Sequence, residues 1–317
     1  MDFEDSLIRT AEMARIGRAG ELPRLLRDGT VQRVRSGAYV APDAWSAATP
    51  EQRQRARIVA VQARARSRLV YVGPSAAVLH GLPLPRGEAE RVHVLQREMN
   101  GQKSRGDIVR HAWPVPDGDI VEIDGLLVTT LSRTLYDIAR LMPEQMSLPA
   151  VDAGLRSVSW RGPGRFDLDA AEELRERVLA LVEDAGAARG IRRARFVIPF
   201  ADGRAQLPGE SVSRLFMHRL GVDPPELQRE VAIAGGRAFP DFAWPRRRRF
   251  GEFDGDAKYI DPAFTAGRDV RRTLRDQRAR EVAITEATGW LPVRWGWEAL
   301  RSLSSYAVLL RAHDVLD

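Results

Sequence analysis

The stretch that decides the fold is residues 239–259, FPDFAWPRRRRFGEFDGDAKY. Two short aromatic-rich runs, 238–244 and 250–254, flank a charged turn at 245–249, and this pattern predicts two antiparallel β-strands. Adjacent strands of such a hairpin would bring Asp241 and Glu252 to the same end of a sheet. Two converging carboxylates offer the hard oxygen ligands that Mg²⁺ prefers, and with a nearby lysine they are what a metal-dependent phosphodiesterase site needs.

Length and composition limit the number of domains and the class of protein. The chain has 317 residues, which exceeds a typical single core and predicts two or three domains. It contains no cysteine, so disulfides and thiolate metal sites are excluded. No apolar run is long enough to span a membrane, and the acidic start MDFEDS is unlike a signal peptide. We therefore expect a soluble, cytoplasmic protein.

The charge balance suits a polyanionic partner without identifying one. There are 49 basic and 43 acidic residues, giving a net charge of +6, but the two signs are interspersed. Lys103 and Lys258 are the two lysines of the chain, and the other basic residues are arginines. A lysine kept at 258 indicates a position where arginine does not serve, because lysine is a compact point charge whose pKa shifts readily. The alternative is that one of two lysines falls there by chance.

Residues 1–48 predict a small winged helix-turn-helix domain. Helices are expected at 3–9, 10–16 and 21–27, followed by two short strands within VQRVRSGAYV at 31–40. The third helix of such a domain enters the DNA major groove. The candidate DNA contacts are Arg24, Arg27, Arg33 and Arg35, and the last two alternate along one strand so that they share a face. A small helical cap with a surface hairpin is the alternative.

Residues 49–195 predict a mixed α/β connecting domain that begins after a linker at 42–50. Strands are expected at 69–73, 91–96, 107–111 and 125–130, and helices at 51–66 and 131–141 and again at 151–158 and 168–182. No catalytic spacing occurs in this region. His80, His93 and His111 are separated by strand and loop segments, and nothing in the sequence brings them together as a zinc site.

Residues 196–317 complete an α+β chain. We expect a helix at 210–220, three antiparallel strands within 227–254, a long helix at 269–288, a strand near 290–297 and a terminal helix at 300–316. Glu210 lies in the first turn of its helix, where a negative charge is also favourable for purely structural reasons. Arginines at helical spacing between 268 and 278 form either a basic stripe or a solvated face.

The C-terminal part, about residues 205–312, resembles the PD-(D/E)xK nuclease superfamily. The similarity is to the branch of small domains like very-short-patch repair endonucleases, the domain of unknown function numbered 559. It rests on PGESVSR, PELQREV, PDFAWP, GEFDGDAKY and GWLPVRWGW. RVRSGAYV in residues 1–45 and GPSAAVLHGLPL in the middle region look like winged-helix proteins of the abortive-infection type IV antitoxin group, the AbiEi-like proteins.

The nuclease resemblance implies a role for each matching residue. Asp241 and Glu252 would be the two metal ligands for Mg²⁺ or Mn²⁺, and Glu210 would be the helical acid that completes the site. The superfamily lysine belongs two residues after Glu252, where this chain has Asp254. Either Lys258 has taken over the lysine's role or catalysis is altered or lost. Asp254 is also a candidate catalytic residue itself, as another carboxylate on the same strand face as Glu252. Gln228 resembles a polar residue on the first strand near such sites.

Two functions remain open. In the first, the winged helix holds double-stranded DNA and the C-terminal domain hydrolyses its phosphodiester bonds. In the second, the chain is a catalytically inactive antitoxin-like repressor that binds operator DNA, has a cognate toxin as a possible partner, and uses the nuclease-like domain as a scaffold. Both bind DNA and neither involves a membrane, and the sequence leaves the oligomeric state undetermined.

Overall fold

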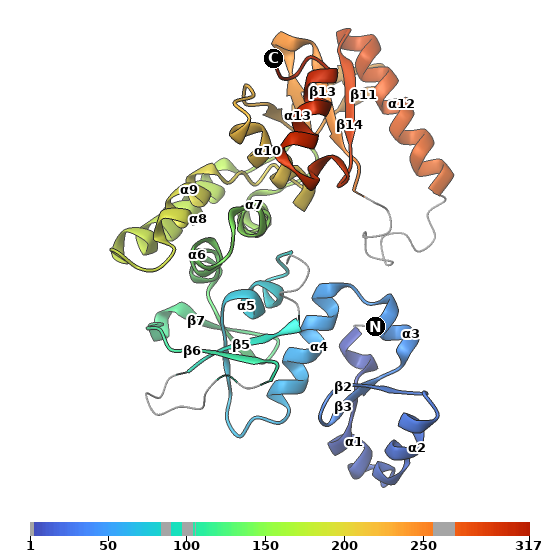
Figure 1. Ribbon diagram of the computed structural model, residues 1–317, viewed down its shortest axis with the longest axis vertical. Coiled ribbons are helices and arrows are strands. Elements are labelled where there is room, and N and C mark those ends of the chain that lie inside the picture. Colours follow the sequence, from blue (N-terminus) through green and yellow to red (C-terminus); the bar gives the residue numbers. More distant parts are fainter. Residues whose placement is uncertain (1–2, 84–89, 97–103, 105, 256–269) are drawn as a thin grey trace. The chain divides into compact units, whose positions relative to one another are not determined.

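The protein is described by a computed structural model covering residues 3–83, 90–96, 104, 106–255 and 270–317, with the side chains of 4, 5 and 270–276 left out (Figure 1). Its contacts divide the chain into two compact units, Met1–Ile138 and Ala139–Asp317. The predicted boundaries at 48/49 and 195/196 do not coincide with this division. Within the described residues, no helix combines the length and the apolar character needed to cross a bilayer.

The first unit begins with a three-stranded sheet that carries short helices. Strand β3 lies between β1 and β2 and is antiparallel to both. Met13, Leu22, Val31 and Tyr39 form the core beneath it. The elements in chain order are η1 (Phe3–Ser6), β1 (Ile8–Arg9), α1 (Thr10–Arg15), η2 (Ala19–Glu21), α2 (Leu22–Arg27), β2 (Gln32–Arg35) and β3 (Ala38–Val40).

Two predictions for this region are wrong. The first helix at 3–9 is instead a 3₁₀ turn followed by a strand, because Ile8 and Arg9 pair with β3. The linker at 42–50 contains α3 (Pro42–Ala47) and the start of α4 (Pro50–Gln62). A capping box between Thr49 and Gln52 begins α4, and proline at the first helical position is compatible with it.

The rest of the first unit is a five-stranded mixed sheet with helices α4 and α5 (Gly73–Leu79) against it. The strand order is β6-β5-β4-β8-β7, with parallel pairs β5/β6 and β4/β8. The strands are β4 (Val70–Tyr71), β5 (Val92–Leu95), β6 (Ile108–His111), β7 (Ile120–Ile123) and β8 (Leu126–Thr129). Strand β7 was not predicted.

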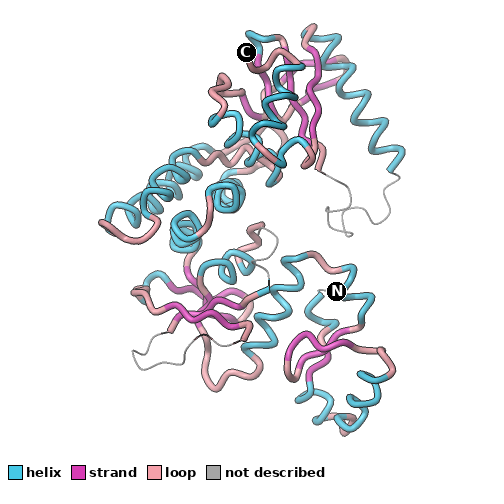
Figure 2. Tube along the Cα trace, in the orientation of Figure 1, coloured by secondary structure: helices cyan, strands magenta, loops and turns pink. Residues whose placement is uncertain are grey.

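A purely helical segment follows (Figure 2). Helix α6 (Leu131–Leu141) runs across the division between the units, and α7 (Glu144–Ser159), α8 (Leu168–Asp184) and α9 (Ile191–Phe200) belong to the second unit. Helix α7 packs against α10 (Pro208–Arg219), where Asp152 and Arg214 form a buried ion pair of 3.0 Å. This contact explains why residues 139–195 join the C-terminal part instead of a separate middle domain.

The second unit ends in a four-stranded sheet between helices, in the order β14-β13-β12-β9. Side chains of α10 and α13 (Leu303–Ala312) share a core with one face of it, and Ile284 of α12 (Val270–Thr288) packs with Phe250 from the other. The strands are β9 (Glu226–Leu227), β12 (Phe242–Trp244), β13 (Arg249–Phe253) and β14 (Leu291–Trp295), and β10 (Val231–Ile233) and β11 (Gly236–Ala238) form a separate hairpin.

The prediction of three successive antiparallel strands in 227–254 is wrong in detail. Residues 227–233 are divided between β9 and β10, and residues 238–244 are divided between β11 and β12. The second break contains Pro240, which has no N–H to donate to a sheet. Strand β13 is antiparallel to β12 as expected, and its other neighbour is β14, to which it is parallel.

Candidate functional site

The hairpin of β12 and β13 places Asp241 beside Glu252, as predicted. Phe242 pairs with Gly251 in the antiparallel register, so the residues before and after this pair are neighbours at one end of the sheet. Oδ2 of Asp241 accepts a hydrogen bond of 2.9 Å from the backbone N–H of Phe253. Oδ1 accepts one of 3.2 Å from Nε2 of Gln228. The amide of Gln228 therefore does lie at the site, where the resemblance placed it.

Glu252 is the carboxylate with unmet bonding capacity. Glu252 is 4% exposed, and its Oε2 accepts a hydrogen bond of 2.7 Å from Nη2 of Arg280 on α12. Oε1 is buried and has no hydrogen-bond partner among the described residues. Burial, followed by the negative charge of Asp241, raises the pKa of Glu252 to about 8. A buried acceptor left in this state is costly unless a donor or a cation meets it.

Asp241 and Glu210 interact electrostatically. Burial raises the pKa of Asp241, and the Phe253 N–H, Arg280 and Gln228 oppose that rise. Burial and the nearby charge of Asp241 raise the pKa of Glu210 well above its usual range. The site therefore holds three buried acids, and the charge of Asp241 acts on both Glu210 and Glu252, which favours sharing protons or binding a cation over full ionisation.

Glu210 also has a structural task. It is 2% exposed, and its two carboxylate oxygens accept the backbone N–H groups of Gln206 at 2.9 Å and Leu207 at 3.1 Å. These bonds cap the start of α10. Glu210 therefore has the structural role at the helix start that its position in the first turn allows, and it also interacts with Asp241.

Asp254, two residues after Glu252, forms an ion pair with Arg294. The distance from Oδ2 to Nη1 is 3.4 Å, and Nε of Arg294 also donates to Glu281 at 2.8 Å. Burial raises the pKa of Asp254. Lys258 lies outside the described residues. Among the described residues, Arg280 is the cation that contacts the Glu252 carboxylate. The sequence placed Arg280 in an arginine-rich helix but did not assign it to the site.

Asp241 and Glu252 are the candidate metal ligands. No group of three or more His, Cys, Asp or Glu side chains within the described ranges is arranged to hold a metal ion. Mg²⁺ is commonly held by one or two carboxylates, with waters and substrate phosphate oxygens completing its octahedron. Glu252, the cross-strand neighbour of Asp241, fits such a partial site because its Oε1 is an acceptor oxygen without a partner among the described residues.

Packing around Phe253 supports the geometry of the site. A Cβ atom on Gly209, in the first turn of α10, would lie 1.9 Å from Cζ of Phe253. The ring also meets Trp297 edge-on, with centroids 5.3 Å apart. Nε1 of Trp295 donates to Ser213 of α10 at 2.8 Å. Helix α10 is therefore held closely against β13 and β14, and glycine at 209 is needed for that approach.

The four arginines proposed for DNA binding have different surroundings. Arg24 and Arg27 are exposed one turn apart on α2, although Arg24 pairs with Asp28 at 3.3 Å. Arg33 is exposed on β2, with its guanidinium 6.0 Å from the ring centroid of Tyr39. Nη1 of Arg35 is bound by both oxygens of Asp107 at 2.7 Å.

The expectation that Arg33 and Arg35 share one strand face does not hold. The register of β2 against β3 shifts between these two residues. A bulge of this kind adds a residue to one strand and re-aims the side chains that follow it. Arg35 pairs with Asp107, and of the four proposed DNA contacts it is Arg24, Arg27 and Arg33 that are exposed.

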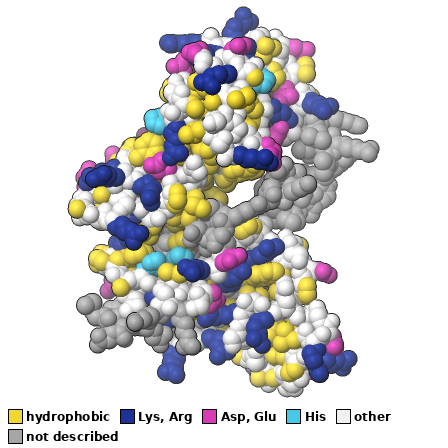
Figure 3. Space-filling view, in the orientation of Figure 1, with side chains coloured by type: hydrophobic (Ala, Val, Ile, Leu, Met, Phe, Trp, Pro, Cys, Tyr) yellow, Lys and Arg dark blue, Asp and Glu magenta, His cyan; other side chains and the backbone are white. Residues whose placement is uncertain are grey.

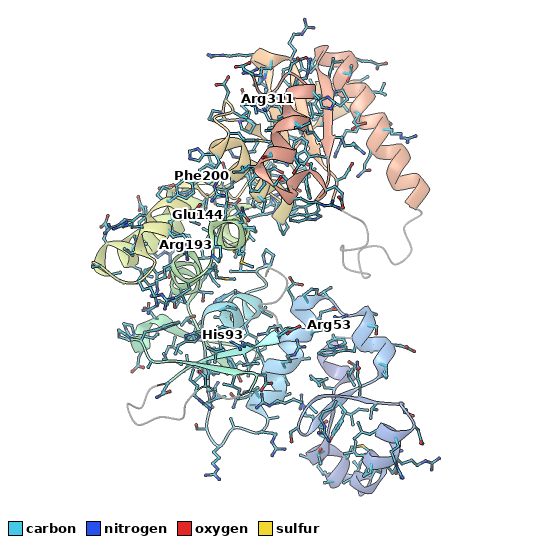
Figure 4. All side chains as sticks on the ribbon, viewed as in Figure 1. Arg53, His93, Glu144, Arg193, Phe200 and Arg311 are labelled. Atoms are coloured by element: carbon cyan, nitrogen blue, oxygen red, sulfur yellow. The ribbon has the colours of Figure 1, made fainter. Side chains whose placement is uncertain are left out.

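Sequence reasoning missed a histidine pair in the first unit. Nδ1 of His93 and Nε2 of His111 share a hydrogen bond of 2.9 Å on the parallel strands β5 and β6 (Figure 4 labels His93). Burial and the neighbouring His111 lower the pKa of His93 to about 3. His80 is apart from them and bonds the Thr129 carbonyl at 2.7 Å. The parallel register brings the pair together, which no local spacing indicates.

Basic side chains do not gather into one patch on the visible face of the molecule. The arginines of the described residues are scattered there among acidic and apolar side chains (Figure 3). Of the predicted basic stripe in 268–278, Arg278 is the arginine whose side chain is described, and it is exposed on α12. The interspersed charge inferred from the composition is thus visible on this surface.

Comparisons with known proteins give partial matches. No family model matches the chain. It is 35% identical over 142 residues to the uncharacterized proteins MT2308 and Rv2248 of two Mycobacterium tuberculosis strains, CDC 1551 and H37Rv. The match covers 44% of this chain and 48% of each relative, so the chain spans about half the length of the curated relatives it matches. These relatives carry no stated activity.

Proposed function

We propose that this chain binds double-stranded DNA and hydrolyses its phosphodiester bonds with Mg²⁺ or Mn²⁺ held by Asp241 and Glu252. The observation that carries the proposal is the buried Oε1 of Glu252, which has no partner among the described residues. Glu252 is the neighbour of Asp241 across the β12–β13 hairpin. Nuclease-like architecture alone would not suffice, because a fold does not establish an activity. The argument rests on the site.

Each residue of the site has a proposed part. Asp241 and Glu252 would hold the divalent cation, which when bound supplies an activated water and neutralises charge on the phosphate. Gln228 and the Phe253 N–H orient the Asp241 carboxylate through their two hydrogen bonds. Glu210 caps α10, and its carboxyl group interacts with that of Asp241. The fold supports a PD-(D/E)xK-like domain, with a mixed sheet that has α10 and α12 on opposite faces.

The first unit would provide the DNA contact. Its element order and the sheet order β1-β3-β2 support a winged helix, in which α2 would be the helix that enters the major groove. Arg24 and Arg27 are exposed on one side of that helix, and Arg33 is exposed on the wing. Phosphate contacts from such residues give affinity without sequence specificity.

The test is incubation of the purified chain with supercoiled plasmid in Mg²⁺ or Mn²⁺. The matched variants are Asp241→Asn and Glu252→Gln at the site, with Glu226→Gln as the control, since Glu226 is an exposed carboxylate of the same sheet. We expect nicking by the wild type and by the control, and none by the two site variants. Wild-type protein that binds plasmid and never nicks it would contradict the proposal.

A second function, a DNA-binding repressor with an inactive nuclease-like domain and a toxin as partner, is favoured by one observation. The position of the superfamily lysine holds Asp254, which is paired with Arg294. Under this alternative, DNA binding persists, plasmid stays intact under all metal conditions, and Asp241→Asn changes neither result.

A further inference from the structure

The ion pair between Glu252 and Arg280 joins strand β13 to helix α12 at the centre of the candidate site. Oε2 and Nη2 are 2.7 Å apart, and the Glu252 side chain is 6% exposed while that of Arg280 is 40% exposed. Arg280 is thus a half-exposed cation whose charged end reaches a buried carboxylate. It also acts on Asp241, whose pKa it lowers against the effect of burial.

Neither partner of this ion pair is fully bonded. Oε1 of Glu252 and Nε of Arg280 are both buried, and neither has a hydrogen-bond partner in the part of the chain that the structure describes. A buried ion pair that serves stability alone usually has its remaining donors and acceptors satisfied. An ion pair with an open acceptor on one partner and an open donor on the other instead indicates two groups that can take further ligands.

A second described cation near the site, Arg294, already binds other carboxylates. Arg294 lies between two carboxylates, bonding Glu281 through Nε and pairing with Asp254 through Nη1. Asp254 and Arg294 therefore neutralise each other, and the lysine position of the motif supplies no net positive charge. Arg280, 28 residues beyond Glu252 in the chain, brings positive charge to the site from a different element.

Arginine is chemically suited to a second ligand at this place. Its guanidinium has five N–H donors in a planar fork, stays charged at all relevant pH values and matches the oxygens of a phosphate. One donor is used on Glu252. A phosphodiester that approaches Asp241 and Glu252 would thus meet the permanent positive charge of Arg280 beside them.

Building on the proposed function, we propose that Arg280 is the phosphate-binding cation of this site and the counter-ion of Glu252 until a divalent cation binds. Glu252 would then exchange Arg280 for the metal. The released guanidinium would contact a non-bridging oxygen of the scissile phosphodiester. The role that the motif gives to a lysine after the second acid would be carried by an arginine on α12.

The experiment compares Arg280→Ala and Arg280→Lys with Arg278→Ala, which removes the same charge from an exposed position of the same helix. Plasmid nicking is followed at saturating Mn²⁺, Mn²⁺ binding is measured by calorimetry, and far-UV circular dichroism checks folding. We expect Arg280→Ala to nick about 10²-fold more slowly, in the range for losing one charge-stabilising donor. It should still bind Mn²⁺, and added guanidinium ion at low millimolar concentration should restore part of the rate.

Arg280→Lys should retain more activity than Arg280→Ala, and Arg278→Ala should match the wild type. A folded Arg280→Ala variant that nicks at the wild-type rate, or that is slow and is not rescued by guanidinium, would overturn this inference alone. Wild-type protein that neither binds Mn²⁺ nor nicks plasmid would overturn the proposed function together with it. The two failures are therefore distinguishable.

Discussion

The backbone N–H of Phe253 donates a hydrogen bond of 2.9 Å to Oδ2 of Asp241, across the hairpin of β12 and β13. The residue before Phe253 is Glu252, so this bond ties one proposed metal ligand to the strand that carries the other. The ring of Phe253 packs on Gly209 at the start of α10. The first turn of α10, the Phe253 ring and the Asp241 carboxylate are therefore mechanically connected.

Gly209→Ala should destabilise the protein in spite of alanine's better helix propensity. The new Cβ would lie 1.9 Å from Cζ of Phe253, and overpacking of this kind costs about 1–3 kcal/mol. Displacement of Phe253 should also weaken the hydrogen bond to Asp241 and slow plasmid nicking. Urea unfolding measures the loss. Gly255→Ala is the control, because a Cβ there would meet its nearest atom at 3.5 Å, and equal stability of the two variants would contradict the prediction.

Stabilisation by Mg²⁺ should increase with pH. The pKa of Glu252 is raised to about 8 in the folded chain, so its contribution to stability is fully present below its unfolded pKa of about 4.5 and is lost as the pH rises through about 8. A divalent cation binds the ionised form and offsets that loss. The increase in Tm with Mg²⁺ should be larger at pH 8.5 than at pH 6, as measured by differential scanning fluorimetry.

Glu252→Gln is the control for this pH dependence. Its amide does not titrate, so both the decline in Tm toward pH 8.5 and the response to Mg²⁺ should be smaller than in the wild type. A Mg²⁺ response that is equal at both pH values, or that persists in the variant, would show that the cation binds elsewhere.

Arg214→Ala should cost about 3–5 kcal/mol of stability at pH 8, the range for removing one partner of a buried ion pair. Asp152, which it pairs with at 3.0 Å, is 1% exposed and would become an uncompensated buried charge. Arg214 also donates to the carbonyl of Phe200 at 2.7 Å, at the end of α9. Urea denaturation at pH 8 measures the change.

The cost of Arg214→Ala should shrink at acidic pH. Burial raises the pKa of Asp152 to about 6 in the wild type, so its contribution is present below its unfolded pKa of about 3.8 and is lost as the pH rises through about 6. Without Arg214 the neutral acid is favoured even more. Repeating the denaturation at pH 5 should give a smaller difference from the wild type; the same difference at both values would argue against the assigned role of the pair.

Substitution of Arg24 and Arg27 by alanine should weaken binding to duplex DNA and lower its salt dependence. Each lost phosphate contact reduces the slope of log K against log salt concentration by about 1. Arg35→Ala should leave that slope unchanged, because Arg35 is bound to Asp107. Fluorescence anisotropy between about 50 and 200 mM salt distinguishes these cases. A larger effect from Arg35 than from Arg24 and Arg27 would contradict the assignment of α2 as the DNA-contacting helix.

Local sequence pattern was sufficient to predict the positions of the helices and strands that surround the site. Helix α10, helix α12 and the β12–β13 hairpin lie where apolar periodicity, proline and glycine signals place them. The pairing of Asp241 with Glu252 could be predicted because a short turn sets the register of a hairpin. The break at Pro240 and the parallel neighbour of β13 were missed, since both depend on which strands meet in the sheet.

The sequence by itself therefore determined that Asp241 and Glu252 would be neighbours, because both belong to one hairpin whose geometry is local. Only the tertiary structure decided that Arg280 meets Glu252, that Arg35 is paired with Asp107, and that residues 139–195 belong to the second unit. These relationships join residues far apart in the chain, and they form only when separate elements pack together. No spacing in the sequence encodes that docking, so the cation of the proposed site emerged from the fold.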